Sequence, residues 1–210
     1  GDSYYVSASS NYGNGSSTYP FPAIQQGIDA SSSGDTVSVA AGTYVENINF
    51  NGKNIAVIGA DSSNTIIDGD SSGSVVTFNS GETQSALLKN FTITNGNTNG
   101  RGGGMQIKMT GDILLSNLVI SNNQASFGGG IIVEGIGGAW NGEAHVSVEN
   151  VVFSGNHATG NGGGYAVYDD YVSTLFKSVT FANNSADGSG GGLHIVGMSH
   201  YAVLANSILW

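Results

Sequence analysis

Residues 150–164 read NVVFSGNHATGNGGG, and residues 178–192 read SVTFANNSADGSGGG. Both stretches contain an alternating apolar run, an Asn-rich turn, an Ala and three consecutive Gly. The alternation predicts a short β-strand with one buried face, and Asn and Gly favour tight corners because they adopt positive φ readily. Further copies occupy residues 90–104 and 117–130, a fifth begins at residue 206, and successive copies start 27, 33, 28 and 28 residues apart. A repeated strand-and-turn unit predicts a solenoid.

The repeated Asn and Gly residues are expected to have structural roles when such coils stack. Each strand is expected to pair with its equivalent in the next coil about 4.8 Å away, so that equivalent Asn side chains can form amide ladders. We interpret the triple glycines as corners where backbones pack closely, since no Lys-Ser or Lys-Thr follows them as in a phosphate-binding loop. The candidate ladder columns are Asn95, Asn122 and Asn183, and Asn123, Asn156 and Asn184.

The composition excludes several classes of protein. The chain has 210 residues, of which 34 are Gly and none is Cys, and its formal net charge is −10. Five Lys and Arg against fifteen Asp and Glu argue against nucleic acid or an anionic membrane as partner. The lack of Cys excludes a disulfide framework and thiol chemistry, and no apolar run has the length of a membrane-spanning helix. The lack of Cys is compatible with a secreted bacterial protein or with a cytosolic one. The glycine-rich, weakly charged composition favours the first, so we expect a secreted or bacterial cell-surface protein without membrane insertion.

Only residues 22–30 have a convincing helical pattern, with Ile24 and Ile28 on one face. A solenoid needs its open end covered, because a terminal coil exposes apolar core and unpaired strand edges. We therefore predict an N-terminal cap at residues 1–35, made of a strand and this amphipathic helix. Residues 36–210 are predicted to form the coils, which we expect to continue beyond residue 210 because the last copy is incomplete.

Several motifs carry a resemblance to known proteins. The stretches at residues 4–7, 23–37 and 41–47 are typical of the N-terminal coils of right-handed parallel β-helix proteins of the pectate-lyase-like superfamily. The Phe-x-x-Asn motifs at residues 153–156 and 181–184, each followed by Gly-Gly-Gly, resemble repeats of chlamydial polymorphic outer-membrane proteins and of large bacterial secreted, anchored β-helix proteins. The resemblance implies an all-β, right-handed parallel β-helix with a short N-terminal capping helix. It implies no single activity, because this scaffold carries lyases, hydrolases, esterases and adhesins.

Departures from the enzymes of this superfamily are informative. The chain shares the Gly-Thr-Tyr-x-Glu pattern of pectin methylesterases at residues 42–46 but lacks their downstream catalytic motifs. It lacks the Gly-His-Gly and Arg-x-Lys motifs of polygalacturonase-like enzymes, and only Asp169-Asp170 is similar to them. Arg101, the single Arg, lies beside a triple glycine. No catalytic residue is therefore assigned, and the weak candidates for acid–base chemistry are Asp169, Asp170 and Glu134.

The loops that follow the triple glycines differ between copies. Equivalent loops of stacked coils lie along one side of a solenoid, where aromatic rings can stack on sugars and carboxylates can accept hydrogen bonds from hydroxyls. The alternative is a set of solvated loops, with Trp140 folded against its own coil. The candidate ligand-binding residues are Trp140, Tyr168, Asp169, Asp170, Tyr171, His200 and Tyr201, with Asp112, Glu134, Glu143 and His145 on the same side.

One segment has the shape of a calcium loop. Alternate oxygens in Asp68-Gly69-Asp70-Ser71-Ser72-Gly73 suit a hard cation, with Asp68, Asp70 and Ser72 as ligands. Residue 79, the twelfth position, is Asn instead of Glu, so this is no EF-hand, and a plain polar turn is the alternative. The four His residues show no zinc-ligand spacing. Calcium is thus the one cofactor that the sequence suggests.

The leading hypothesis is a non-catalytic, secreted or cell-surface β-helix with an adhesive or scaffolding role and a capacity to bind glycans. The first alternative is a carbohydrate-active enzyme, a polysaccharide lyase or glycoside hydrolase, that uses the acidic and aromatic side of the solenoid. The second alternative is an assembly module, or a module that docks on a secretion partner, through the last coil around Trp210. The lack of transferred catalytic motifs favours a protein that is not an enzyme.

Overall fold

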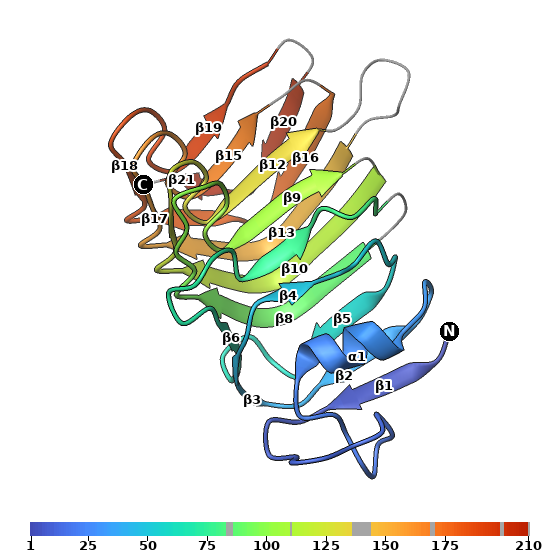
Figure 1. Cartoon of the computed structure of the whole chain (residues 1–210). Helices are drawn as coiled ribbons and strands as arrows, with labels where there is room; N and C mark the ends of the chain where they lie inside the picture. Colours follow the sequence, from blue (N-terminus) through green and yellow to red (C-terminus); the bar gives the residue numbers. More distant parts are fainter. Residues whose placement is uncertain (83–85, 110, 136–143, 169–170, 198–199, 210) are drawn as a thin grey trace.

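The computed structural model describes residues 1–82, 86–109, 111–135, 144–168, 171–197 and 200–209. They form a right-handed parallel β-helix in which strands pair in parallel with their equivalents in the next coil. Figure 1 shows the coils stacked in chain order, with the only helix of the described residues at the N-terminal end of the stack. The solenoid predicted from the repeats, and the parallel β-helix implied by the resemblance, are confirmed.

Two faces of the solenoid belong to one 12-stranded sheet. The first face contains β1 (Ser3–Val6), β2 (Thr36–Val39), β5 (Ala56–Gly59), β16 (Val172–Lys177) and β20 (His200–Ala205). The second face contains β3 (Gly42–Val45), β6 (Thr65–Asp68), β17 (Thr180–Ala182) and β21 (Ile208–Leu209). Three long strands run across both faces: β8 (Ala86–Thr94), β10 (Gly111–Ser121) and β13 (Ala144–Ser154).

The third face is a six-stranded sheet, and a short three-stranded sheet occupies the turn region before it. The third face contains β4 (Ile48–Asn49), β7 (Val76–Phe78), β9 (Met105–Met109), β12 (Ile131–Gly135), β15 (Tyr165–Tyr168) and β19 (Leu193–Ile195). The short sheet contains β11 (Gln124–Ala125), β14 (His157–Ala158) and β18 (Ser185–Ala186).

The first and second faces meet at a corner formed by the first residue of each repeat. Asn90, Asn117 and Asn150 adopt left-handed backbone conformations with φ of 66°, 54° and 54°, which turns the long strands there. Their amides also bond between coils, from Asn117 Nδ2 to Asn90 Oδ1 (3.1 Å) and from Asn150 Nδ2 to Asn117 Oδ1 (3.3 Å). Ser178 and Asn206 have the same conformation in later copies. This ladder was not among the columns predicted from the sequence.

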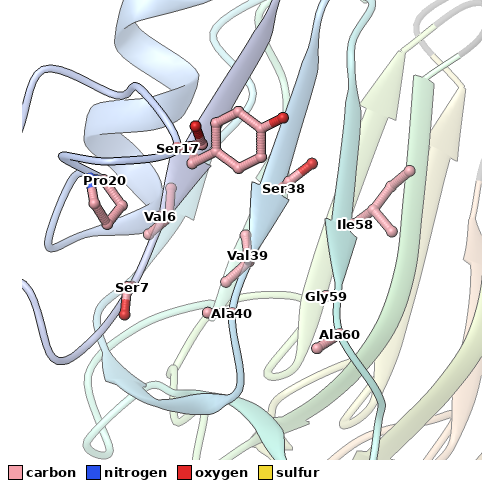
Figure 2. A pocket seen from close by; sticks show the side chains of 11 residues that line it. Val6, Ser7, Ser17, Pro20, Ser38, Val39, Ala40, Ile58, Gly59 and Ala60 are labelled. Atoms are coloured by element: carbon pink, nitrogen blue, oxygen red, sulfur yellow. The ribbon is translucent and has the colours of Figure 1, made fainter.

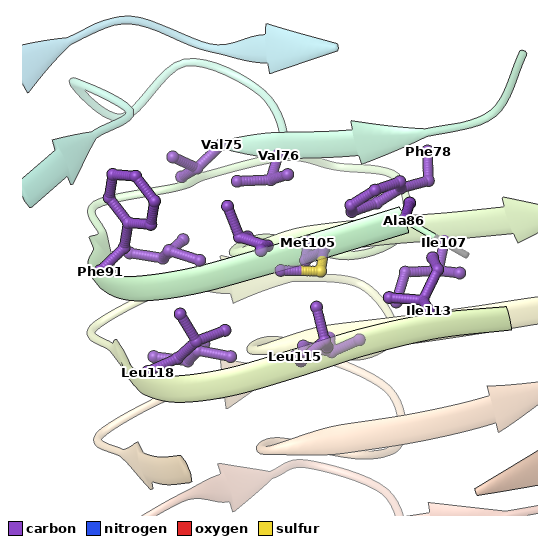
Figure 3. Close-up of a cluster of buried hydrophobic side chains, with 14 of the residues drawn as sticks. Val75, Val76, Phe78, Ala86, Phe91, Met105, Ile107, Ile113, Leu115 and Leu118 are labelled. Atoms are coloured by element: carbon purple, nitrogen blue, oxygen red, sulfur yellow. The ribbon is translucent and has the colours of Figure 1, made fainter. Parts of the chain in front are cut away.

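The core consists of the inward-facing residues of the three faces. Figure 3 shows this packing, with Phe91 and Leu118 in successive coils and Met105 in the middle of the cluster. Further along, the rings of Phe153 and Phe181 stack with centroids 4.7 Å apart. Core-facing residues at equivalent positions in successive coils therefore stack on one another and form a continuous apolar column.

The ladder predicted for Asn123, Asn156 and Asn184 is confirmed. Asn123 Nδ2 donates to Asn156 Oδ1 at 3.0 Å, and Asn156 Nδ2 donates to Asn184 Oδ1 at 2.9 Å. The second hydrogen of Asn156 Nδ2 reaches the Ile120 carbonyl at 2.8 Å. Asn123 and Asn156 are 1% and 0% exposed, so these bonds satisfy polar groups that water cannot reach.

The other predicted column, Asn95, Asn122 and Asn183, forms no amide ladder among the described residues, and that prediction is wrong. These residues have φ of 58°, 56° and 56° and serve as left-handed corners. The intervening copy carries Gly155 at this position, which has no amide to continue a ladder. Asn95 instead donates to a carboxylate oxygen of Asp68 at 3.0 Å.

Glycine is required in the triple-glycine motifs for two reasons: the first residue has a left-handed backbone conformation, and the second leaves no room for a side chain. The first glycine of each triple, at residues 102, 128, 162 and 190, has φ between 62° and 73°, a region that side chains disfavour. At the second position the neighbouring coil is in the way: a Cβ on Gly129 would lie 2.4 Å from the His157 carbonyl oxygen and 2.6 Å from the Gly163 carbonyl oxygen. The structural interpretation of this motif is confirmed.

Helix α1 (Ile24–Ala30) buries Ile24 and Ile28 and contacts β1, β2 and β4. Strand β1 pairs with β2 in the same sheet as the later coils. The domain division at residue 35 remains a prediction. In the described part of the chain, no helix is long and apolar enough to cross a membrane.

Candidate functional site

The candidate site lies at the corner where the third face ends and the first face begins, which we call the rim. On the third-face side, the strand register aligns Glu134 with Lys108 and with Tyr168. On the first-face side, it aligns Asp112, His145, Ser173 and Tyr201 in one row across four strands. The described members of the predicted set therefore do gather along one side of the solenoid.

The outer face next to the rim is covered by the turns that carry the triple glycines. Ile132 and Ala166 face outward from the core yet are fully buried, because the left-handed first glycines bring their turns onto these side chains. A Cβ on Gly102 would lie 2.9 Å from Ile132 Cγ2, and one on Gly162 would lie 2.6 Å from Ala166 Cβ. The residue just before each triple glycine is thereby placed over the outer face.

Arg101 precedes the first triple glycine and is the centre of a mixed charged and aromatic cluster. Its Nη1 lies 2.6 Å from Glu134 Oε1, and Gln106 Nε2 donates to Glu134 Oε2 at 3.3 Å. Its Cζ lies 5.7 Å from the centre of the Phe127 ring and 5.3 Å from that of Tyr168, within the range of cation–π attraction. We call these residues, with Asn161, the Arg101 cluster: Arg101, Gln106, Phe127, Glu134, Asn161 and Tyr168.

Tyr168 links three successive coils within the cluster. Its ring meets the Phe127 ring edge-on at 5.3 Å, and its hydroxyl accepts a hydrogen bond from Asn161 Nδ2 at 2.9 Å. On the other side it lies 5.5 Å from the ring of His194, whose Nε2 is buried with no hydrogen-bond partner among the described residues. The Arg101 side chain stays 41% exposed while that of Glu134 is 8% exposed. The contacts within the cluster thus hold the guanidinium of Arg101 and the ring of Tyr168 in fixed positions.

The structure places the predicted acid–base candidate Glu134 in an ion pair. Its two carboxylate oxygens already accept hydrogen bonds from Arg101 and Gln106. Trp140, Asp169 and Asp170 lie outside the described residues, as do Glu143 and Trp210.

The remaining predicted ligand-binding residues occupy the start of the first face. Tyr171 has a left-handed backbone with φ of 64°, and Tyr201 is 74% exposed on β20. His200 begins β20, and its side chain is not described. Sequence reasoning missed Phe127 and Asn161. The available signal was the column just before each triple glycine, where Arg101, Phe127, Asn161 and Ser189 vary inside a constant motif.

A second set of polar side chains lies on the first-face side of the rim. His145 Nδ1 is 2.5 Å from Ser173 Oγ, and Asp112 is the register neighbour of His145 on the other side. A hollow of about 480 Å³ opens beside this row. It is lined by Asp112, Ile113, Leu114, His145, Ser147 and Glu149.

The segment predicted to bind calcium forms a hydrogen-bonded turn. Asp68 Oδ1 accepts the backbone N–H of Asp70 at 2.9 Å, and Asp68 Oδ2 accepts Asn95 Nδ2 at 3.0 Å. The Ser72 N–H donates to the Gly69 carbonyl at 2.8 Å. Within the described ranges, no three His, Cys, Asp or Glu side chains are grouped so that they could hold a metal ion. Calcium binding by Asp68, Asp70 and Ser72 remains a prediction.

The Gly-Thr-Tyr-x-Glu motif at residues 42–46 has a structural role in this chain. The Tyr44 hydroxyl accepts the Ala8 N–H at 3.1 Å and donates to the Ala40 carbonyl at 2.8 Å. The Glu46 carboxylate accepts the N–H groups of Ile24 (2.7 Å) and Gln25 (3.0 Å) at the start of α1. Burial raises the pKa of Glu46 above its ordinary value, while these N–H groups act in the opposite direction. The motif joins the helix to the coils.

Replacing Glu46 with Ala is expected to destabilise the protein by about 1–2 kcal/mol, because two N–H groups at the start of α1 lose their acceptor. Since the folded-state pKa of Glu46 is raised, ionisation costs stability as the pH rises through that pKa. The stability difference between the two proteins should therefore shrink from pH 4 to pH 7. Urea unfolding across this range measures it, and equal stabilities at every pH would contradict the capping role.

Comparisons with known proteins agree with this fold. Residues 150–164 and 178–196 match the Chlamydia polymorphic membrane protein repeat, whereas no curated protein sequence matches the chain significantly. A pectin methylesterase from carrot is similar in structure, with a TM-score of 0.50, 15% identity, and coverage of 88% of this chain and 64% of the enzyme. A pectin methylesterase from Aspergillus niger has a TM-score of 0.45, 16% identity, and coverage of 98% of this chain and 74% of the enzyme.

At 15% identity the carrot enzyme supports the fold alone, and this chain spans 64% of that enzyme's length. The repeat match covers the two stretches in which the Asn ladder and the triple glycines are most regular. The chain is therefore a right-handed parallel β-helix whose third and fourth repeats are similar to those of Chlamydia polymorphic membrane proteins.

Proposed function

We propose that this protein is a secreted or cell-surface β-helix with an adhesive or scaffolding role, which binds glycans at the rim without chemically changing them. The repeats similar to those of chlamydial membrane proteins support surface display. The aromatic and hydrogen-bonding side chains at the rim, Arg101 beside Tyr168 among them, support glycans as the ligand class.

The observation that carries the proposal is the Arg101 cluster. Stacking of the repeats accounts for the recurring Asn and Gly positions within them. It does not account for the contacts of the single Arg of the chain with the rings of Phe127 and Tyr168. A half-exposed guanidinium beside an aromatic ring offers hydrogen-bond donors and an apolar surface to a sugar. The carboxylate of the cluster, Glu134, is occupied by Arg101 and Gln106, which favours binding over acid–base chemistry.

Replacing Tyr168 with Ala is expected to weaken glycan binding at least about tenfold, or ~1.4 kcal/mol, because the ring that would stack on the sugar is lost. The measurement is a glycan array, followed by titration of the best glycan against both proteins. The matched control is Tyr12→Ala, since Tyr12 is 91% exposed and remote in sequence from the cluster. Thermal unfolding checks that both variants fold. Equal binding by wild type and Tyr168→Ala would contradict the proposed site.

A second candidate function is a carbohydrate-active enzyme that cleaves esters on glycans, and one observation favours it: the contact of His145 Nδ1 with Ser173 Oγ. Ser173 Oγ would attack the carbonyl carbon while its proton passes to His145. His145 would then protonate the leaving alcohol oxygen, and water would release the acyl group from Ser173 by the same proton path.

If this second candidate is correct, a fluorophosphonate probe should label Ser173 in the wild-type protein, because an activated serine oxygen attacks the probe's phosphorus. Ser173→Ala should abolish the labelling, whereas Ser147→Ala, a change in the hollow that His145 also lines, should leave it intact. Peptide mass spectrometry identifies the labelled residue. A wild-type protein that takes up no probe at Ser173 would exclude this mechanism.

A further inference from the structure

A groove separate from the rim lies at the N-terminal end of the first face, as Figure 2 shows. It has a volume of about 490 Å³, which is within the usual range of small-ligand sites. Its floor is formed by β1, β2 and β5, and one wall is formed by the segment between β1 and α1. The lining residues are Tyr5, Val6, Ser7, Ser17, Pro20, Ser38, Val39, Ala40, Ile58, Gly59 and Ala60.

Neighbouring strands contribute aromatic, hydroxyl-bearing and aliphatic side chains to the floor of the groove. The register aligns Tyr5 with Ser38 and Ser38 with Ile58, so an aromatic, a hydroxyl-bearing and an aliphatic residue are neighbours on three adjacent strands. Figure 2 shows Ser38 and Ile58 on the floor of the groove. Tyr5 is 38% exposed. The wall adds Ser17 and Pro20. Among the described residues, no charged side chain lines the groove, although the chain as a whole carries a formal net charge of −10.

Backbone hydrogen bonds hold the wall against the floor. The Tyr5 N–H donates to the Gly15 carbonyl at 2.8 Å, and the Phe21 N–H donates to the Tyr5 carbonyl at 2.8 Å. Within the wall itself, the Ser10 side chain donates from Oγ to the Pro20 carbonyl at 2.7 Å. The groove is thus formed before any ligand arrives, which lowers the entropic cost of binding.

We propose that this groove binds a neutral sugar unit of a glycan. A pyranose has an apolar CH face that suits the ring of Tyr5, and hydroxyls that suit Ser17 and Ser38. Both serine side chains make no hydrogen bond within the described residues, so a ligand can use them without breaking a protein contact. A charged sugar would enter a lining without a counter-charge and lose its hydration there.

The test is titration of the intact protein with neutral disaccharides (cellobiose, maltose, lactose and mannobiose) and with digalacturonate as the charged comparison. Saturable binding of at least one neutral disaccharide, at least about tenfold tighter than that of digalacturonate, is expected. Tyr5→Ala should weaken it at least about tenfold and Ser38→Ala less, whereas Tyr12→Ala should not change it. Tyr5→Phe keeps the ring and should retain most of the affinity, so it separates loss of stacking from loss of folding.

The result is independent of the proposed rim site. Tyr168→Ala should leave disaccharide binding at the groove unchanged, and Tyr5→Ala should leave glycan binding at the rim unchanged. The inference is overturned if no neutral disaccharide binds saturably, if digalacturonate binds equally well, or if a folded Tyr5→Ala variant binds like the wild type.

Discussion

Replacing Asn156 with Ala is expected to lower the free energy of unfolding by about 3–5 kcal/mol, since several buried polar groups lose partners at about 1–3 kcal/mol each. Asn156 Oδ1 accepts both the backbone N–H (3.1 Å) and the side-chain amide (3.0 Å) of Asn123. Its Nδ2 donates to the Ile120 carbonyl at 2.8 Å and to Asn184 Oδ1 at 2.9 Å. The change removes the middle of the ladder and leaves neighbours on both sides unsatisfied.

Chemical unfolding of the wild type and of Asn156→Ala measures this loss. The matched control is Asn99→Ala, because Asn99 is exposed and its side chain makes no hydrogen bond in the described structure. That control should change stability by less than about 0.5 kcal/mol. Equal stability losses in the two variants would show that the ladder contributes nothing specific.

Gly129→Ala is expected to be the next most damaging of the changes considered, at about 3 kcal/mol. The new Cβ would lie 2.4 Å from the His157 carbonyl oxygen and 2.6 Å from that of Gly163. Because both atoms belong to the backbone of the next coil, they can move away only if the coils separate. Separation would strain the hydrogen bonds from Gly129 N to the Gly162 carbonyl (3.0 Å) and from Gly130 N to the Gly163 carbonyl (2.9 Å).

The control for this prediction is Gly100→Ala in the turn of the first repeat. A Cβ there meets only Thr98 Oγ1, at 3.2 Å, and its backbone is not left-handed. Thermal unfolding should therefore show a large drop in the midpoint for Gly129→Ala and almost none for Gly100→Ala. A Gly129→Ala protein as stable as the wild type would contradict the close approach of the coils.

The fold could be predicted because each coil repeats the same pattern of alternating apolar strand residues followed by Asn and Gly turn residues. Val151 and Phe153 face the core because strand side chains alternate, and Asn156 follows at a fixed offset in a column that forms a ladder. The sequence does not reveal which Asn side chains form an amide ladder and which Asn residues adopt the left-handed backbone conformation of a corner. Asn122 and Asn123 are adjacent and identical in type, yet one is a left-handed corner and the other a buried ladder member.

The side of the solenoid that carries the candidate site could be predicted from the sequence, but the residues that form the Arg101 cluster could not. Stacking explains why Glu134 and Tyr168 lie side by side. It did not reveal that Arg101 and Phe127 would join them, since their placement depends on turns folding over the outer face after a left-handed glycine. The groove at Tyr5 was missed for a similar reason, because its wall is an irregular segment with no repeat to align.

The proposal that the rim binds glycans without changing them is tested most directly by a glycan array with product analysis. The wild-type protein and Tyr168→Ala are applied to the array, and retained glycans are analysed by mass spectrometry after prolonged incubation. The proposal predicts saturable retention by the wild type, loss of retention by the variant, and glycans of unchanged mass. An array on which no glycan is retained, together with release of shortened or de-esterified products from a polysaccharide, would contradict it.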